Sequence, residues 1–217
     1  MKVWSFGDSW AYGHGLEDHN PRFGDYVAMQ KNIRHINKGE CGSSLGQVVH
    51  EFTTQYNDIT KDDIVLFVLP PDTRWYDMLE PGQINSLMNG MPEYDEFIKN
   101  KTVYWFTYHH SLFIYTLGKM CEDKGCKFIM AHNYGRLQIE KQFRCIVKDE
   151  WFLDKSQSLT AILGAKDYEN YGKDLKEDGP PHLLESKYFI PGDNHPNVRG
   201  HKKIGKLIME KLDELYK

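Results

Sequence analysis

The sequence has few cysteines, four in 217 residues. That number is too small for a disulfide scaffold in a chain of this length. Cys121 and Cys126 are five positions apart, and no second pair of cysteine or histidine residues at zinc-ligand spacing follows them. We therefore interpret the cysteines as free thiols and expect no metal site and no cofactor.

The sequence also lacks an excess of positive charge and a long hydrophobic run. Its formal net charge is −4, with acidic and basic residues mixed along the chain. This pattern provides neither the basic surface of a nucleic-acid-binding protein nor a basic face for a membrane. The apolar runs are much shorter than the roughly 20 residues that span a bilayer. We therefore expect no nucleic-acid partner and no membrane partner.

Hydrophobic residues make up 40% of the chain and aromatic residues 13%, which is typical of a globular protein. The length suits one domain over residues 1–217, and the sequence contains no repeat, linker or low-complexity tract. The first predicted strand begins at residue 3, which leaves no room for a signal peptide. Unless a leader precedes residue 1, we expect a cytoplasmic protein. Nothing in the sequence predicts the oligomeric state.

Apolar segments of strand type alternate with segments of helical period. We predict strands over 3–6, 33–36, 63–69 and 127–132, and helices over 23–31, 45–56, 103–120 and after residue 197. Residues 72–96 have few periodic apolar positions and are interpreted as a long loop, and 138–187 as short helices with loops. The expected fold class is α/β, a three-layer α/β/α sandwich with a mainly parallel sheet of about five strands.

The first predicted strand runs directly into Gly7-Asp8-Ser9, where small and short polar residues allow a sharp turn. Ligands and reactive groups of α/β folds lie at the carboxyl ends of the strands. Ser9 is therefore presented to a crevice and is a candidate nucleophile. The alternative is an ordinary turn without chemistry.

Near the other end of the chain, Asp193-Asn194-His195-Pro196-Asn197 precedes the last predicted helix. A serine nucleophile needs a base that takes its proton and an acid that orients the base, and Asp-x-His carries both in one short loop. Pro196 disfavours a helical conformation at His195 and so holds it ahead of the helix. The alternative is a turn with a helix cap, in which Asn197 is the cap.

Together these motifs resemble the GDSL or SGNH family of serine hydrolases, whose first motif is Gly-Asp-Ser and whose last is Asp-(one or two residues)-His before a C-terminal helix. The second family motif, Asn-x-Gly-x-x-Gly, matches residues 37–42. The resemblance covers the whole chain and implies an SGNH, flavodoxin-like fold. It implies that Ser9, His195 and Asp193 form a catalytic triad and that the N–H of Gly42 contributes to the oxyanion hole.

The sequence departs from the family at the third motif, Gly-x-Asn-Asp, whose asparagine side chain completes the oxyanion hole. Pro70-Pro71-Asp72-Thr73-Arg74 stands there instead. We expect Thr73 to replace the asparagine, because its hydroxyl sits on a short, stiff side chain. We expect Arg74 to be a rim residue whose free guanidinium selects acidic substrates.

Three further residues adjoin these positions and are assigned to the same substrate-binding region. They are Asp8 and Trp10, on either side of Ser9, and Trp75, which follows Arg74. The two tryptophans are predicted to form part of the pocket wall.

The resemblance predicts a serine esterase or deacylase that cleaves a small acyl ester, with an O-acetyl group on a carbohydrate as one candidate substrate. The alternative is a binding module that keeps the fold but has lost turnover, and the missing asparagine is its support. Acyl transfer to another alcohol would use the same groups and is not excluded by the sequence.

Overall fold

Four parallel strands form the central sheet of the computed structural model, which describes residues 1–72, 74–80, 83–87, 92–99, 101–134, 136–164 and 187–217. β1 (Lys2–Gly7) lies between β2 (Arg34–Gly39) and β3 (Ile64–Leu69), and β6 (Lys127–His132) pairs with β3. The described residues thus contain four strands of this sheet, where about five were expected. Next to β6 the described residues make a single bridge, from Phe152 to Met130, and no full strand.

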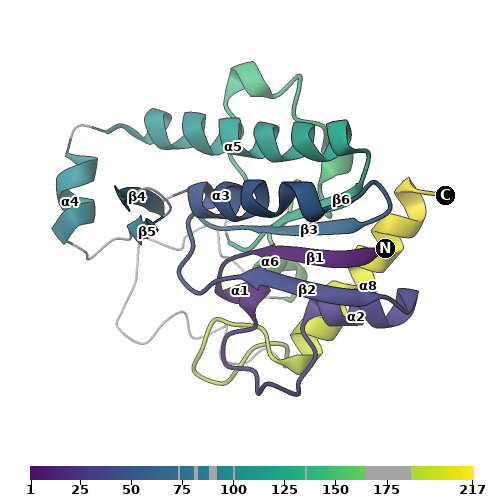
Figure 1. Ribbon diagram of the computed structural model, residues 1–217. Coiled ribbons are helices and arrows are strands. Elements are labelled where there is room, and N and C mark those ends of the chain that lie inside the picture. Colours follow the sequence, from purple (N-terminus) through teal and green to yellow (C-terminus); the bar gives the residue numbers. More distant parts are fainter. Residues whose placement is uncertain (73, 81–82, 88–91, 100, 135, 165–186) are drawn as a thin grey trace.

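Helices cover both faces of the sheet, which gives the expected three layers (Figure 1). On one face lie α2 (Phe23–Lys31) and α8 (Val198–Leu215), which pack against each other. On the other face lie α3 (Leu45–Gln55) and α5 (Val103–Lys124). The prediction of an α/β/α sandwich is therefore confirmed.

The alternation of side chains along the central strands fills the two core layers. In β3 every residue is buried, because both faces of this strand are covered by helices. Successive side chains point to opposite faces, so each helical layer receives alternate residues of β3. Ile64, Leu66 and Val68 pack with α2 and α8, whereas Val65, Phe67 and Leu69 pack with α3 and α5.

The interpretation of residues 72–96 as a loop is wrong. This segment contains an antiparallel hairpin of β4 (Trp75–Glu80) and β5 (Gln83–Leu87), and α4 begins within it (Pro92–Ile98). In Figure 1 the hairpin and α4 lie beyond the end of the sheet where β1 leads into α1 (Ser9–Tyr12). A two-stranded hairpin needs no core periodicity of its own, so the sequence pattern did not predict it.

The described part of 138–187 consists of short helical segments joined by loops, as expected. They are η2 (Lys141–Phe143), η3 (Asp149–Trp151) and α6 (Leu159–Ile162), and another short 3₁₀ turn, η1 (Tyr56–Asp58), follows α3.

None of the helices in the described part of the chain combines the length and the hydrophobicity that a bilayer crossing requires.

A fully buried histidine, His201, joins α8 to the start of α2. Its Nδ1 accepts a hydrogen bond from the Phe23 backbone N–H at 3.2 Å, and its ring stacks on the Phe23 ring. The Nε2 atom of His201 is buried and has no partner in the described part of the chain. Burial lowers the pKa of His201 to about 3, so the imidazole is neutral in the folded protein.

We expect the protein to lose stability on mild acidification because of His201. Between pH 6.5 and about pH 3 the unfolded chain binds a proton that the folded chain excludes, so the free energy of unfolding falls as the pH falls. The loss from this residue between pH 7 and pH 5 is about 2 kcal/mol. Urea unfolding at both pH values measures it. His201→Asn keeps an acceptor near the Phe23 N–H but cannot ionise, and an equal pH dependence in this variant would contradict the assignment.

Candidate active site

The turn that presents Ser9 depends on Gly7, the last residue of β1. Gly7 has φ 153°, and a Cβ there would lie 2.7 Å from the Val68 carbonyl oxygen on the neighbouring strand, so only glycine fits. Asp8 follows as the N-cap of α1, and its Oδ1 accepts a hydrogen bond from the Trp10 N–H at 3.1 Å. Ser9 is the first residue of this helix, at the carboxyl end of a central strand.

The structure brings Ser9 and His195 together from opposite ends of the chain. His195 Nε2 lies 2.7 Å from Ser9 Oγ across 186 positions of sequence, and His195 Nδ1 lies 2.5 Å from Asp193 Oδ1. Asp193 Oδ1 also accepts the His195 backbone N–H at 3.1 Å. The three side chains therefore stand in the order hydroxyl, imidazole, carboxylate.

These contacts define the proton positions in the network. A carboxylate can only accept, so Nδ1 of His195 carries the proton and donates it to Asp193. Nε2 then has a free lone pair that accepts the Ser9 hydroxyl proton. Partial burial of Asp193 opposes its ionisation, but the hydrogen bonds from His195 outweigh burial and lower the pKa of this carboxyl. Asp193 is thus ionised and keeps the imidazole in the tautomer that a general base requires.

The second motif begins in β2, which ends at Gly39, and continues into the loop that leads to α3. Gly42 has φ 83°, in the left-handed region that favours glycine. Glu40 N–H donates to the Gly7 carbonyl at 3.0 Å, which ties this loop to the end of β1 next to Ser9. Within the described part of the chain neither the N–H of Ser9 nor that of Gly42 donates to a backbone or side-chain acceptor. Both N–H groups are therefore free to bind an acceptor from outside the described part of the chain.

The Asp8 carboxylate is fully buried beside Ser9 and has three donors. Besides the Trp10 N–H on Oδ1, its Oδ2 accepts Arg74 Nη1 and Asn133 Nδ2, each at 2.7 Å. Burial raises the pKa of Asp8, and the positive charge of Arg74 opposes that rise. Arg74 comes from the segment after β3 and Asn133 directly follows β6. The carboxyl ends of three adjacent strands therefore meet at Asp8.

The prediction that Arg74 is a free guanidinium on the rim is wrong. Its side chain is only 20% exposed and forms an ion pair with the buried Asp8. Arg74 is therefore anchored to a buried carboxylate and is not the free group that was expected. Thr73, the expected replacement for the family's asparagine, lies outside the described residues.

Of the two tryptophans assigned to the pocket wall, Trp10 lies in the core instead. Trp10 is 0% exposed and packs in the core on the α2 and α8 side, with its Nε1 donating to the Tyr134 hydroxyl at 2.8 Å. It follows Ser9 on α1, and this short helix turns its side chain into the core. Trp75, at the start of β4, is half-buried in an aromatic cluster with Phe97, Trp105 and Phe113, among others.

Two residues near Ser9 were missed by the sequence interpretation. Asn133 directly follows a buried strand, and the rule that selected Ser9, the carboxyl end of a central strand, would also have selected it. His14 lies beside the proposed base, with its ring 4.6 Å from the His195 ring, and its Nδ1 is 3.6 Å from Cys41 Sγ. No spacing in the sequence indicates that His14 and His195 are neighbours.

His14, Asp193 and His195 are also the one group in the described part of the chain whose ligand atoms are close enough to share a metal ion, within 4.8 Å of one another. Both nitrogens of His195 already have partners, Ser9 and Asp193. His195 and Asp193 are thus already bonded to each other, and His195 also contacts Ser9.

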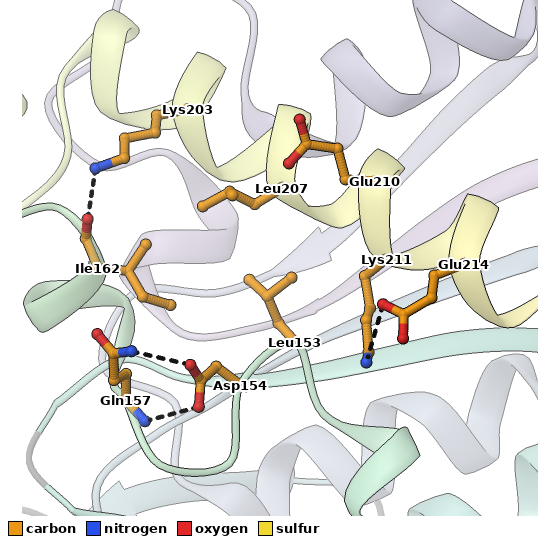
Figure 2. A pocket seen from close by; sticks show the side chains of 9 residues that line it. All are labelled: Leu153, Asp154, Gln157, Ile162, Lys203, Leu207, Glu210, Lys211 and Glu214. Atoms are coloured by element: carbon orange, nitrogen blue, oxygen red, sulfur yellow. Dashed lines mark hydrogen bonds and ion pairs between the residues drawn. The ribbon is translucent and has the colours of Figure 1, made fainter.

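A separate hollow of about 420 Å³ lies between α8 and the segment 153–162 (Figure 2). Its apolar part consists of Leu153, Ile162 and Leu207. Polar groups around it satisfy each other: Lys203 Nζ donates to the Ile162 carbonyl, and Gln157 donates to Asp154. None of the residues discussed above lines this hollow, so it belongs to a different part of the molecule.

No protein-family model matches the sequence, and no curated protein matches it either. Solved structures do match over nearly the whole length. A candidate lipolytic protein of the G-D-S-L family from Desulfitobacterium hafniense DCB-2 has TM-score 0.51 and 14% identity, covering 97% of this chain and 98% of its own. A member of that lipolytic family from Veillonella parvula DSM 2008 has TM-score 0.52, 12% identity and 97% coverage of both chains.

A lipase candidate from Chitinophaga pinensis DSM 2588 is similar to the same degree, with TM-score 0.52 and 14% identity over 99% of this chain and 98% of its own. At such identities the shared property is the fold. The chain therefore has the α/β fold of the SGNH, or GDSL-like, hydrolases. This fold is the one that the motifs at residues 7–9, 37–42 and 193–195 predict.

Proposed function

We propose that this single-domain chain is a serine ester hydrolase of the SGNH kind that cleaves small acyl esters. The observation that carries the proposal is the 2.7 Å contact between Ser9 Oγ and His195 Nε2, with Asp193 on the other imidazole nitrogen. In a resting serine hydrolase the nucleophile, base and orienting acid stand in this order and at these distances.

In the proposed reaction Ser9 Oγ bonds to the acyl carbon while its proton moves to His195 Nε2. The electron pair of the carbonyl π bond moves to the carbonyl oxygen, which becomes the oxyanion. When the tetrahedral intermediate collapses, the alcohol leaves with the proton from His195. Water then repeats the sequence on the acyl-enzyme, and the acid is released. Asp193 stays ionised throughout and stabilises the imidazolium.

The N–H groups of Ser9 and Gly42 are the proposed backbone donors to the oxyanion. Both are free in the described part of the chain, and Gly42 lies in the loop that Glu40 ties to the end of β1. The proposed substrate is a small acyl ester, with O-acetyl groups on carbohydrates as the class to test first. p-Nitrophenyl acetate, longer p-nitrophenyl esters and an acetylated sugar together measure this preference.

The proposal predicts that a fluorophosphonate probe labels Ser9, because only an activated serine reacts. Trypsin cleavage after Lys2 and Arg22 leaves Ser5 and Ser9 in one peptide, so fragmentation of the labelled peptide identifies the residue. His195→Ala should abolish labelling. Protein that has been unfolded by heat and then incubated with the probe measures the background labelling. If the folded protein is not labelled, the alternative of a binding module without turnover is supported. The missing third-motif asparagine is the sequence feature that favours this alternative.

A further inference from the structure

Asp8 is surrounded by side-chain hydrogen-bond donors, in addition to the backbone N–H groups of Ser9 and Gly42 described above. Asp8 is buried, adjacent to Ser9 in sequence, and fixed by the three hydrogen bonds described above. Arg74 and Asn133 share one of its oxygens. An acceptor that is held on all sides cannot rotate, so it fixes in turn the side chains that donate to it.

Of these two side chains, Arg74 is the one able to reach a second acceptor. Asn133 is fully buried, so its side-chain amide has no exposed surface to offer a bound substrate. Arg74 is partly exposed, and a guanidinium has five N–H groups, of which one donates to Asp8. No second acceptor for the Arg74 guanidinium lies in the described part of the chain.

The positive charge of Arg74 acts on the Gly42 loop as well as on Asp8. Burial, Asp8 and Glu40 raise the pKa of the Cys41 thiol, and Arg74 counteracts them. Since Cys41 precedes Gly42, the guanidinium acts on the loop that carries one proposed oxyanion donor. Ser9, which carries the other, follows Asp8.

We propose that Arg74 donates the third hydrogen bond to the oxyanion, in place of the asparagine side chain of the SGNH family, and that Asp8 and Asn133 are positioning residues that hold it there. This inference rests on the serine-hydrolase function proposed above. A charged donor binds a developing oxyanion more strongly than an amide does. The ion pair with Asp8 removes the mobility that otherwise makes an arginine a poor fixed donor.

The first test replaces both partners of the ion pair. Removing Arg74 alone leaves a buried, unpaired carboxylate and destabilises the fold. The double variant Asp8→Asn/Arg74→Gln removes both charges and keeps two amides that can bond to each other. We expect kcat for p-nitrophenyl acetate to fall about 100- to 1,000-fold, as after loss of an oxyanion donor, with KM changed less than about threefold. Arg144→Gln, which removes an exposed arginine on η2's C-cap, is the control and should leave kcat unchanged.

The second test is chemical rescue. Free guanidinium at tens of millimolar should raise the kcat of Arg74→Ala at least tenfold. Urea and sodium chloride at the same concentrations are the controls. Guanidinium should not restore activity to Asp8→Asn/Arg74→Ala, because the anchor for the ion is missing. A trifluoromethyl ketone, which forms an oxyanion on Ser9, should lose affinity in the double amide variant in proportion to kcat.

These experiments test the role of Arg74 separately from the proposed serine-hydrolase function. A double amide variant with wild-type kcat would overturn the role of Arg74, and so would loss of activity and of thermal stability together without guanidinium rescue. In both cases labelling of wild-type Ser9 would leave the hydrolase proposal intact. Absence of labelling and of hydrolysis in the wild type would instead remove the proposed function itself.

Discussion

Ser9→Ala is expected to lower kcat for p-nitrophenyl acetate by about 10⁴-fold or more, with little change in KM. The hydroxyl oxygen that forms the bond to the acyl carbon is lost, and water is not held at the same place. The side chain is small and nearly buried, so its removal disturbs the fold little. Steady-state kinetics with circular dichroism as a folding control measure the effect.

The chain offers a matched control for this variant in Ser5. Ser5 Oγ lies 2.8 Å from His35 Nε2, and His35 Nδ1 lies 2.7 Å from Asp25 Oδ1, so the same three groups stand in the same order. Ser5, however, is fully buried in the middle of β1, between β2 and β3, and its backbone neighbours pair in the sheet. It has neither substrate access nor free N–H groups beside it. Ser5→Ala should reduce thermal stability and retain kcat. If Ser9→Ala remained active, Ser9 would not be the nucleophile.

Asp193→Asn is expected to lower kcat about 10³- to 10⁴-fold near neutral pH. The asparagine amide can donate to His195 Nδ1, which the aspartate cannot. The imidazole proton would then move to Nε2, where it faces the Ser9 hydroxyl and leaves no lone pair to accept that proton. The change therefore removes the base while keeping all side-chain volumes. Kinetics, together with nitrogen NMR of the His195 tautomer, test this explanation.

The matched control is Asp154→Asn. Asp154 also accepts hydrogen bonds from a backbone N–H two residues later and from nearby side chains in its own turn, and these lower its pKa. It lines the hollow beside α8 and has no contact with Ser9. Asp154→Asn should keep wild-type kcat. A loss of less than tenfold in Asp193→Asn would show that Asp193 does not control the tautomer of His195.

Much of the fold follows from local patterns in the sequence. The buried run of β3, the amphipathic period of α3 and the cap at Asn197 depend on residues within one element, and the structure has these elements at the predicted places. The hairpin β4–β5 escaped prediction because a two-stranded ribbon outside the central sheet is under no alternation imposed by that sheet's core.

Within the candidate site, the sequence by itself determined the residue types and the ends of the chain from which they come. A strand that ends in Gly-Asp-Ser and an Asp-x-His before the last helix are local features. Tertiary structure alone decided their environment. Whether Trp10 faces the pocket or the core depends on how α1 packs on the sheet, and it faces the core.

The partner of Arg74 is the clearest case of this division. Nothing near residue 74 indicates that its charge is paired 66 positions away with Asp8, or that Asn133 shares the same oxygen from 125 positions away. These contacts exist because β1, β3 and β6 are neighbours in a parallel sheet, so their carboxyl ends converge. Strand order is a property of the whole packed chain, and no local spacing encodes it.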